Sequence, residues 1–315
     1  MGGMCYSAQL IQQYEEYVDL NGADIDIEAF ARLYGFRCLD DRIKIPKVVE
    51  VAFQGKGSPQ ESNIQAALEQ YQAQQATKLE QELFKQRTRL VDAERTLLVK
   101  TTKAATESQR IATSKMAWAQ SKLADLRRTE LTPQDARIYP GFYAPVIVME
   151  SGRKVVKPMR YQCRPEGKAA SFDAKFPGTY NARRDNLEGF WREQFGYSHG
   201  ILAISAFYEH VELKKADGEP EKVILEFNPR PQQVMLVACL WSRWSAPGEE
   251  DLLSFAAITD EPPAEVAAAG HDRCVIPIKP EHVDAWLSPD RYTIQDLYDI
   301  LDDRERPYYE NRKAA

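Results

Sequence analysis

A long segment without glycine or proline constrains this chain more than any other feature. Neither residue occurs from Gln60 to Thr132, and the segment is dominated by Ala, Gln, Glu, Lys, Arg and Leu, which favour helices. A single helix of that length would extend about 110 Å, and neither half of it would have a partner. We therefore expect a helical hairpin that turns near Thr101-Thr102, so that the two halves pack against each other.

The apolar residues of this segment follow a helical spacing that is typical of a coiled-coil seam, with Gln86 as the one polar break. The apolar positions of the predicted seam are Ala76, Leu79, Leu83, Leu90, Ala93 and Leu97. Basic residues outnumber acidic ones from Lys85 to Arg128, which indicates a solvated helix face more often than a nucleic-acid contact. We expect residues 57–135 to be an insertion that packs on itself, on a second copy or on a protein partner.

The regions on either side of the insertion have short apolar segments that are typical of strands. The predicted strands are Ala144–Met149, Ile201–Tyr208, Ser254–Thr259 and Cys274–Ile278, with Val223–Phe227 and Val234–Trp241 forming a hairpin around Asn228-Pro229. Strands that follow strands, with few helices between them, predict an α+β fold. We expect a curved, mainly antiparallel sheet or barrel with flanking helices, built by one discontinuous domain of residues 1–56 and 136–315.

Composition narrows the class of protein. The net charge of −6 argues against a protein that coats DNA non-specifically. The longest apolar run, Val234–Trp241, is too short to cross a bilayer, and no signal-peptide pattern opens the chain. Five separated cysteines and four histidines predict no disulfide framework, no metal and no cofactor. We expect a cytoplasmic protein without membrane contact, associated with the nucleoid when it is on DNA.

Cys5 lies directly after Met4, near the start of the chain. A cysteine at the first position of a chain carries an amine and a thiol on adjacent carbons, with unperturbed pKa values of about 8 and 8.5. This pair suits aldehydes, because the amine forms a Schiff base and the thiolate closes on it to give a thiazolidine. A free cysteine is more often a small buried hydrophobe, so Cys5 taken alone favours that interpretation.

Other polar residues stand at the ends of apolar segments. Asn181 and Arg183 are two residues apart, which in an extended segment places both on one face. Glu209 ends an apolar strand, where burial favours a raised pKa and a role in proton transfer. His271 and Arg273 precede another strand, where the imidazole can transfer protons near pH 7 and the guanidinium can bind phosphate.

Together these segments resemble the successive motifs of the SOS response-associated peptidase (SRAP) family. The matching segments are Met4-Cys5, Asn181-Ala182-Arg183, Phe207-Tyr208-Glu209, Leu240–Trp244 and His271-Asp272-Arg273, with Pro158–Tyr161 in place of an Arg-Trp-Gly-like element. The resemblance covers nearly the whole chain outside a stretch from about residue 57 to 135. It rests on the order and combination of the motifs.

The resemblance implies a sensor of abasic sites in single-stranded DNA that acts in the DNA damage response. In that family, autoproteolysis exposes the cysteine, which then captures the sugar aldehyde as a thiazolidine. The product is a DNA–protein crosslink, and its reversal is a lyase-like activity. Carried over by motif, Cys5 would be the nucleophile, Asn181 would position it or the sugar, Glu209 would transfer protons and His271 would assist opening of the sugar ring. The implied DNA contacts are Arg160, Arg183 and Arg273 to phosphates, and Thr259 as a weaker candidate.

The sequence departs from the family pattern at the chain start. Met1-Gly2-Gly3 precede Met4, so the aminothiol of Cys5 requires initiation at Met4, cleavage after Met4, or first residues foreign to the natural protein. Tyr6-Ser7 stand where the family often has Gly-Arg, which implies a missing phosphate contact. His210 stands where the family usually has Trp, which affects stacking on a base.

Two other functions remain open from the sequence. A cysteine peptidase or amidohydrolase would use Cys5 with His271 as the base and Asn181 to orient it. This enzyme would turn over a peptide or amide and would tolerate a blocked N-terminus. Alternatively, the chain is a non-catalytic interaction protein that works through the helical insertion.

Overall fold

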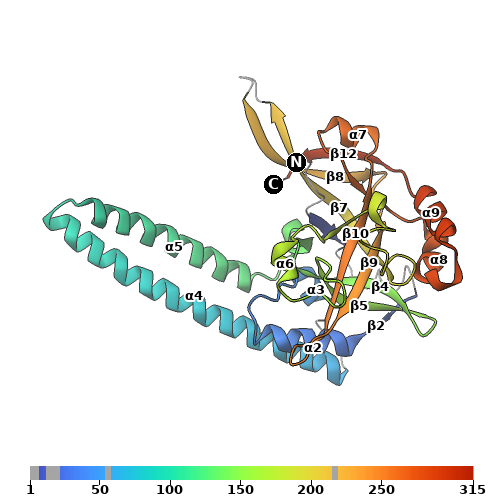
Figure 1. Cartoon of the computed structure of the whole chain (residues 1–315). Coiled ribbons are helices and arrows are strands. Elements are labelled where there is room, and N and C mark those ends of the chain that lie inside the picture. The colour runs from blue at the N-terminus through green and yellow to red at the C-terminus, as the bar shows by residue number, and fades with distance from the viewer. Residues whose placement is uncertain (1–6, 12–21, 54–57, 215–218, 315) are drawn as a thin grey trace.

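A computed structural model describes residues 7–11, 22–53, 58–214 and 219–314. Two long helices, α4 (Pro59–Val99) and α5 (Lys103–Arg127), form an antiparallel hairpin that projects from the remainder of the molecule (Figure 1). Lys100 ends α4, and Thr102 caps α5 by accepting a hydrogen bond from the Ala105 amide (3.1 Å). The predicted hairpin and its turn at residues 101–102 are confirmed.

The start of α4 is set by a capping box. The Ser58 hydroxyl accepts from the Glu61 amide, the Glu61 carboxylate accepts from the Ser58 amide, and Pro59 occupies the first turn. The first turns of α4 then bury Ile64 and Leu68 in the core of the sheet domain, beside α2 (Ile27–Arg37). These two residues are out of phase with the hairpin seam because they pack on a different partner.

The sheet domain contains strands in mixed order, and most of their pairings are antiparallel. Its strands are β1 (Ser7–Leu10), β2 (Asp24–Ile25), β3 (Arg137–Ile138), β4 (Tyr143–Glu150), β5 (Arg153–Tyr161), β6 (Asn181–Arg183), β7 (His199–Lys214), β8 (Pro220–Arg230), β9 (Met235–Trp244), β10 (Leu252–Asp260), β11 (Cys274–Val275) and β12 (Tyr308–Lys313). The pairings β10–β5, β5–β4, β4–β7, β7–β9 and β9–β10 return to their starting strand. The predicted barrel-like, mainly antiparallel α+β fold is confirmed.

Short helices flank this sheet. They are α3 (Lys47–Val51), α6 (Phe172–Lys175), α7 (Ala264–Ala268), α8 (Val283–Leu287), α9 (Ile294–Asp302) and the 3-10 turns Pro133–Ala136, Arg184–Asn186, Pro280–His282 and Pro289–Arg291. The inner strands are apolar on both faces, as Ile201–Ile204 on β7 illustrates, because helices and neighbouring strands cover them. No described helix is long and apolar enough to cross a membrane.

One predicted pairing is wrong. β8 and β9 do not form the hairpin expected around Asn228-Pro229, because β8 continues through these residues to Arg230 and pairs with β12. Both strands instead lie along β7. The outer part of β7, from Phe207, pairs with β8, and its inner part, up to Ile204, pairs with β9.

Strands from before the hairpin belong to the same sheet as strands from after it. β1 pairs with β3 and β7, and β2 pairs with β5. In β1, Ser7 lies opposite Tyr208, the residue that precedes Glu209. The division of the chain into residues 1–56 with 136–315 and an insertion of residues 57–135 stays a prediction, but these pairings require both flanking segments for one sheet.

Candidate functional site

A buried acid and a buried imidazole meet where β7 passes the start of β11. Nε2 of His271 lies 3.0 Å from Oε2 of Glu209, and both side chains are almost fully enclosed. Glu209 comes from the middle of β7, whereas His271 follows Gly270. Gly270 has a φ of +95°, a conformation that side chains with a Cβ rarely adopt, and this turn directs His271 back into the domain.

The other nitrogen of His271 is held by the backbone. Its Nδ1 lies 2.9 Å from the Arg273 carbonyl oxygen and 3.3 Å from the Arg273 amide nitrogen. The shorter contact favours a proton on Nδ1, which leaves Nε2 facing the Glu209 carboxyl group. Nε2 lies 3.0 Å from Oε2, but the contact does not have the geometry of a hydrogen bond. A carboxyl group and an imidazole in contact can exchange a proton, and we refer to the pair as the proton store.

Asn181 is fixed by a neighbouring strand. β6 pairs with β10 in parallel, with Asn181 opposite Ala257 and Arg183 opposite Thr259. The Thr259 hydroxyl donates to Oδ1 of Asn181, and both side chains are buried. The amide Nδ2 of Asn181 is also buried and has no hydrogen-bond partner in the part of the chain that the structure describes. It is a donor available to a ligand.

Thr259 is fully buried, which differs from the surface position that a DNA contact suggests. Its observed contact is the hydrogen bond that orients Asn181. Thr259 also lies opposite Val275 of β11, so β10 connects Asn181 to the segment that carries His271. A direct contact between Thr259 and DNA stays a prediction.

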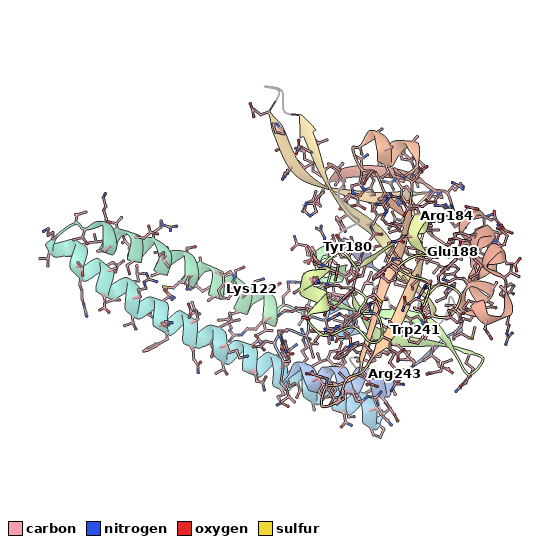
Figure 2. The ribbon with its side chains drawn as sticks, viewed as in Figure 1. Lys122, Tyr180, Arg184, Glu188, Trp241 and Arg243 are labelled. Atoms are coloured by element: carbon pink, nitrogen blue, oxygen red, sulfur yellow. The ribbon has the colours of Figure 1, made fainter. Side chains whose placement is uncertain are left out.

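Two of the arginines expected to bind phosphate share one carboxylate. Oδ2 of Asp185 lies 2.8 Å from Nη2 of Arg183 and 3.7 Å from Nη2 of Arg273. Arg183 and Asp185 are about half exposed, so the cluster is open to solvent and keeps an excess positive charge. Asp185 was not identified from the sequence, although its position two residues after Arg183 is a local signal for such a pair. Figure 2 labels Tyr180 and Arg184, the residues that directly precede and follow β6 in the chain.

Arg160 belongs to a different cluster. It binds Asp173 (2.8 Å), and Arg164 binds the same carboxylate. Arg160 lies opposite Ser254 of β10, whereas Asn181 lies opposite Ala257, three residues further along the same strand. That offset corresponds to about 10 Å along a strand. The structure thus brings Arg183 and Arg273 together and leaves Arg160 apart from them; its contact with phosphate stays a prediction.

Cys5, the predicted nucleophile, lies outside the described residues. The four described cysteines are buried or half-buried. Burial raises the pKa of Cys163 to about 12 and also raises the pKa values of Cys38, Cys239 and Cys274. These thiols are therefore protonated at neutral pH and are poor nucleophiles.

The contacts of His271 and Asn181 differ from those that a cysteine hydrolase needs. His271 contacts Glu209 and the Arg273 backbone, whereas Asn181 is bound by Thr259. Among the described residues, Asn181 does not contact His271 to orient it. The described residues also contain no cluster of His, Cys, Asp and Glu that could hold a metal ion.

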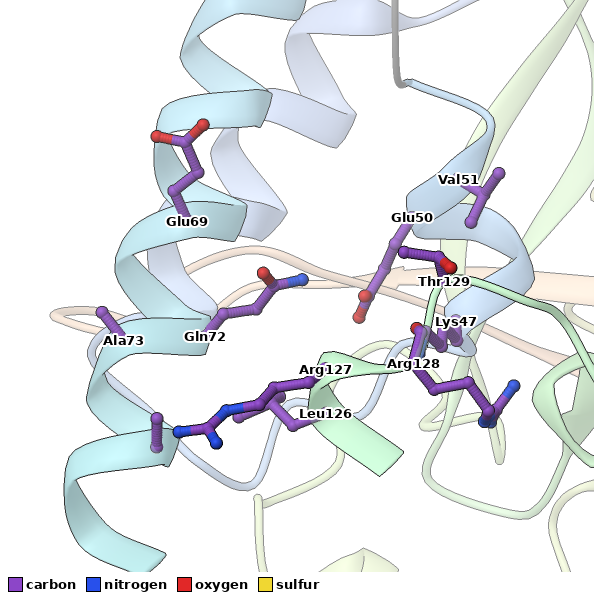
Figure 3. Close-up of a pocket in the computed structure, with 11 residues that line it drawn as sticks. Lys47, Glu50, Val51, Glu69, Gln72, Ala73, Leu126, Arg127, Arg128 and Thr129 are labelled. Atoms are coloured by element: carbon purple, nitrogen blue, oxygen red, sulfur yellow. The ribbon is translucent and has the colours of Figure 1, made fainter. Parts of the chain in front are cut away.

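A cavity of about 430 Å³ lies at the base of the hairpin, between α3, α4 and the end of α5 (Figure 3). Lys47 and Arg128 line it opposite Gln72 of α4. Lys47 donates to the carbonyl oxygens of Asp125 (2.9 Å) and Arg128, which fixes the end of α5 to the domain. The cavity shares no residue with the Glu209–His271 site, and its contacts are those of a structural junction.

Solved structures of other proteins resemble this chain at low sequence identity. The chain is similar to a crystal structure of a Bacteroides thetaiotaomicron protein (14% identity, 57% of this chain and 78% of that one, TM-score 0.48). It is also similar to a Bordetella bronchiseptica protein (19%, 60% and 90%, 0.46) and to a phage-related protein of the same organism (17%, 60% and 85%, 0.44). No curated protein matches. The family model described as SOS response associated peptidase (SRAP) matches residues 95–313, more than half of the chain, and the protein therefore belongs to the SRAP family.

Proposed function

We propose that this protein captures abasic sites in single-stranded DNA through a thiazolidine formed by Cys5. The observation that carries the proposal is the buried Glu209–His271 pair (3.0 Å) beside β1. β1 begins at Ser7, opposite the residue before Glu209. Cys5 precedes Ser7 by two residues in the sequence, which supports its assignment to this site.

The proposed reaction proceeds in two balanced steps. The α-amine of Cys5 adds to the C1′ aldehyde of the ring-opened deoxyribose, and loss of water gives a Schiff base. The thiolate of Cys5 then adds to the imine carbon, and the imine nitrogen gains a proton, which closes the thiazolidine. No oxidant or metal is needed, because no atom changes its oxidation state overall.

The described residues include groups that can carry out the proton transfers of this reaction. A proton on the Glu209–His271 pair can pass to the ring oxygen as the sugar opens, and the C1′ hydroxyl group returns its proton to the pair. The pair can then protonate the hydroxyl group that leaves as water. The free Nδ2 of Asn181 can donate to an oxygen of the substrate. Arg183 and Arg273 can bind the flanking phosphates in exchange for Asp185.

The free amine must first be produced from the chain as given. Hydrolysis of the Met4–Cys5 peptide bond would place a carboxyl group on Met4 and the amine on Cys5, consuming one water. This step is the hydrolysis of a peptide bond, the kind of activity that the name of the SRAP family describes. Initiation at Met4 followed by removal of that methionine gives the same aminothiol.

The test is a crosslinking assay with an oligonucleotide that carries one abasic site. The protein that starts at Met4 is expected to give a heat-stable band on a denaturing gel, and Cys5→Ala none. Glu209→Gln keeps the shape of the side chain but removes the proton acceptor, so we expect crosslinking at least about 100-fold slower. Intact mass measures whether Cys5 is the first residue.

The matched control is Glu221→Gln, a partly exposed acid on β8 that pairs with Lys313 (3.0 Å), which is expected to crosslink normally. A Met4-start protein with Cys5 at its terminus that forms no crosslink would overturn the proposal. A crosslink that persists in Cys5→Ala would overturn the assigned nucleophile. Turnover of amide substrates by a protein with a blocked N-terminus would favour the hydrolase instead.

A further inference from the structure

Arg137, the first residue of β3, is a buried cation beside the start of β1. Its backbone pairs with Gln9, and its side chain extends back along β1 toward the chain start. Nε and Nη2 donate to the Ser7 hydroxyl oxygen (3.1 and 3.0 Å). The guanidinium carbon lies 3.7 Å from the ring centroid of Tyr208 and 5.0 Å from that of Tyr139.

Arg137 differs from the other buried arginines in its partners. Three described arginines are buried to a similar degree, with exposed fractions of 7% for Arg37 and 8% for both Arg137 and Arg164. Arg37 binds Glu50, and Arg164 binds Asp173. Arg137 has no carboxylate within 4.0 Å among the described residues, and a hydroxyl oxygen is the one hydrogen-bond acceptor that it contacts.

The carboxylate that feels the charge of Arg137 is occupied elsewhere. Glu226 lies opposite Tyr208 on β8 and interacts electrostatically with Arg137. Its oxygens are bound by Arg312 (2.8 Å) and by the Asn228 amide (3.0 Å). An arginine that is buried without a partner is unfavourable, because the cation loses hydration and gains no counter-charge. The aromatic rings offset a part of this cost.

We infer that Arg137 is an anion-binding residue that takes a DNA phosphodiester as its counter-ion. The inference rests on the proposed function, which supplies single-stranded DNA at this site. Within the described residues, Nη1 of Arg137 makes no hydrogen bond, whereas Nε and Nη2 donate to Ser7. Tyr208 fixes the guanidinium plane. Consecutive residues of a strand face opposite sides, so the phosphate would lie across β7 from Glu209.

The experiment measures binding of a lesion-free oligothymidylate at several NaCl concentrations. Arg137→Gln is expected to weaken binding about tenfold, as loss of one charge-assisted hydrogen bond predicts. It should also lower the slope of log K against log salt by about 0.7, the value for one phosphate contact to a single strand. Arg137→Lys keeps the charge and should retain most of the slope.

The control is Arg192→Gln, which removes an exposed arginine that pairs with its neighbour Glu193 (2.9 Å). Equal affinity and slope for Arg137→Gln and Arg192→Gln would overturn the inference. If Arg137→Gln does not fold, Arg137→Lys supplies the test. The inference would then be overturned by a slope for Arg137→Lys that falls by about 0.7, the value for one lost phosphate contact. The crosslinking assay, run on the same proteins, separates this inference from the proposed function. A wild-type protein that binds through Arg137 but never crosslinks overturns the proposed function alone.

Discussion

The sheet domain and the helical hairpin are packed in opposite ways. The domain core is filled by large side chains, and Trp286, Phe53 and Phe227 are fully buried. The α5 side of the hairpin seam is formed mainly by alanines. Its fully buried positions on α5 include Ala112 and Ala119, which are seven residues apart. The domain therefore gains stability from buried apolar area, whereas the hairpin gains it from close approach of two helix backbones.

The outer part of the hairpin differs in charge from the rest of the chain, which includes the base of the hairpin. From Phe84 to Lys122 the hairpin has nine Lys and Arg and three Asp and Glu, a net charge of +6, although the whole chain carries −6. The remainder of the chain therefore carries −12. Large apolar side chains are also exposed on this part of the hairpin, with 76% of Phe84 and 53% of Trp118 accessible. The net charge of the whole chain is therefore an average over parts of opposite charge. A net charge of −6 does not argue against a polyanionic partner at the hairpin.

Removing a large side chain should affect the two regions very differently. Trp286 is fully buried, lies 3.9 Å from the His199 ring centroid and donates to the Gly200 carbonyl oxygen (3.0 Å). Trp286→Ala should lower the free energy of unfolding by about 3–5 kcal/mol. Trp118→Ala on the hairpin should change it by less than about 0.5 kcal/mol. Urea denaturation followed by circular dichroism measures both, and similar losses would contradict the contrast in packing.

Acid should weaken the domain before the hairpin. Burial lowers the pKa of His199 to about 3, and the residue is neutral, with Nδ1 against the Trp286 carbonyl oxygen and Nε2 accepting from the Gly196 amide. The unfolded chain binds this proton near pH 6.5, so the unfolded state gains stability as pH falls below that value. Between pH 7 and 4.5 this linkage costs about 2–3 kcal/mol.

The described hairpin contains no histidine, so it lacks this linkage. Hydrogen exchange at pH 7 and 4.5, corrected for the intrinsic rates, should show lost protection in β7 and α8 before α5. His199→Gln should remove most of the additional loss. Equal loss of protection in the hairpin and the domain at pH 4.5 would contradict this expectation.

The sequence predicted the parts of the structure that depend on local patterns. The hairpin and its turn followed from helix propensity, and most strands followed from apolar runs and turn residues. The β8–β9 hairpin was wrong because pairing depends on the length of β7, which offers its two parts to two different strands. Pairing partners at long sequence separation are not encoded in any local pattern.

The candidate site was predictable to a similar extent. Motif order identified Glu209 and His271, which the structure brings within 3.0 Å. It did not indicate that Asp185 would bridge two arginines, or that Thr259 would orient Asn181 from the interior. The departure at Ser7 implied a missing cation, but the guanidinium that lies there comes from Arg137, 130 residues away. Only the sheet register shows that contact.

In the hairpin, the sensitive change is to enlarge a buried residue, whereas in the domain it is to remove a large side chain. Ala112 is fully buried in the seam between α4 and α5. Ala112→Leu should lower the free energy of unfolding by about 1–3 kcal/mol, because the helices must separate to accept the side chain. Ala117→Leu, at an exposed position of the same helix, is the control and should have no measurable effect. A stabilised Ala112→Leu would indicate that the seam is loosely packed.

The smallest expected effect concerns the polar break in the seam. Gln86 is buried, its Nε2 donates to Glu82 (2.9 Å), and its Oε1 has no partner in the described structure. Gln86→Met keeps the length of the side chain and removes the buried acceptor, while Glu82 retains Lys115 at 3.8 Å. The free energy of unfolding should rise by about 1 kcal/mol. Thermal denaturation measures this gain, with Gln81→Met, at an exposed position of α4, as the control. A loss of stability would mean that Gln86 has a bound partner, such as a water molecule, and that the seam tolerates polarity as the domain core does at Glu209.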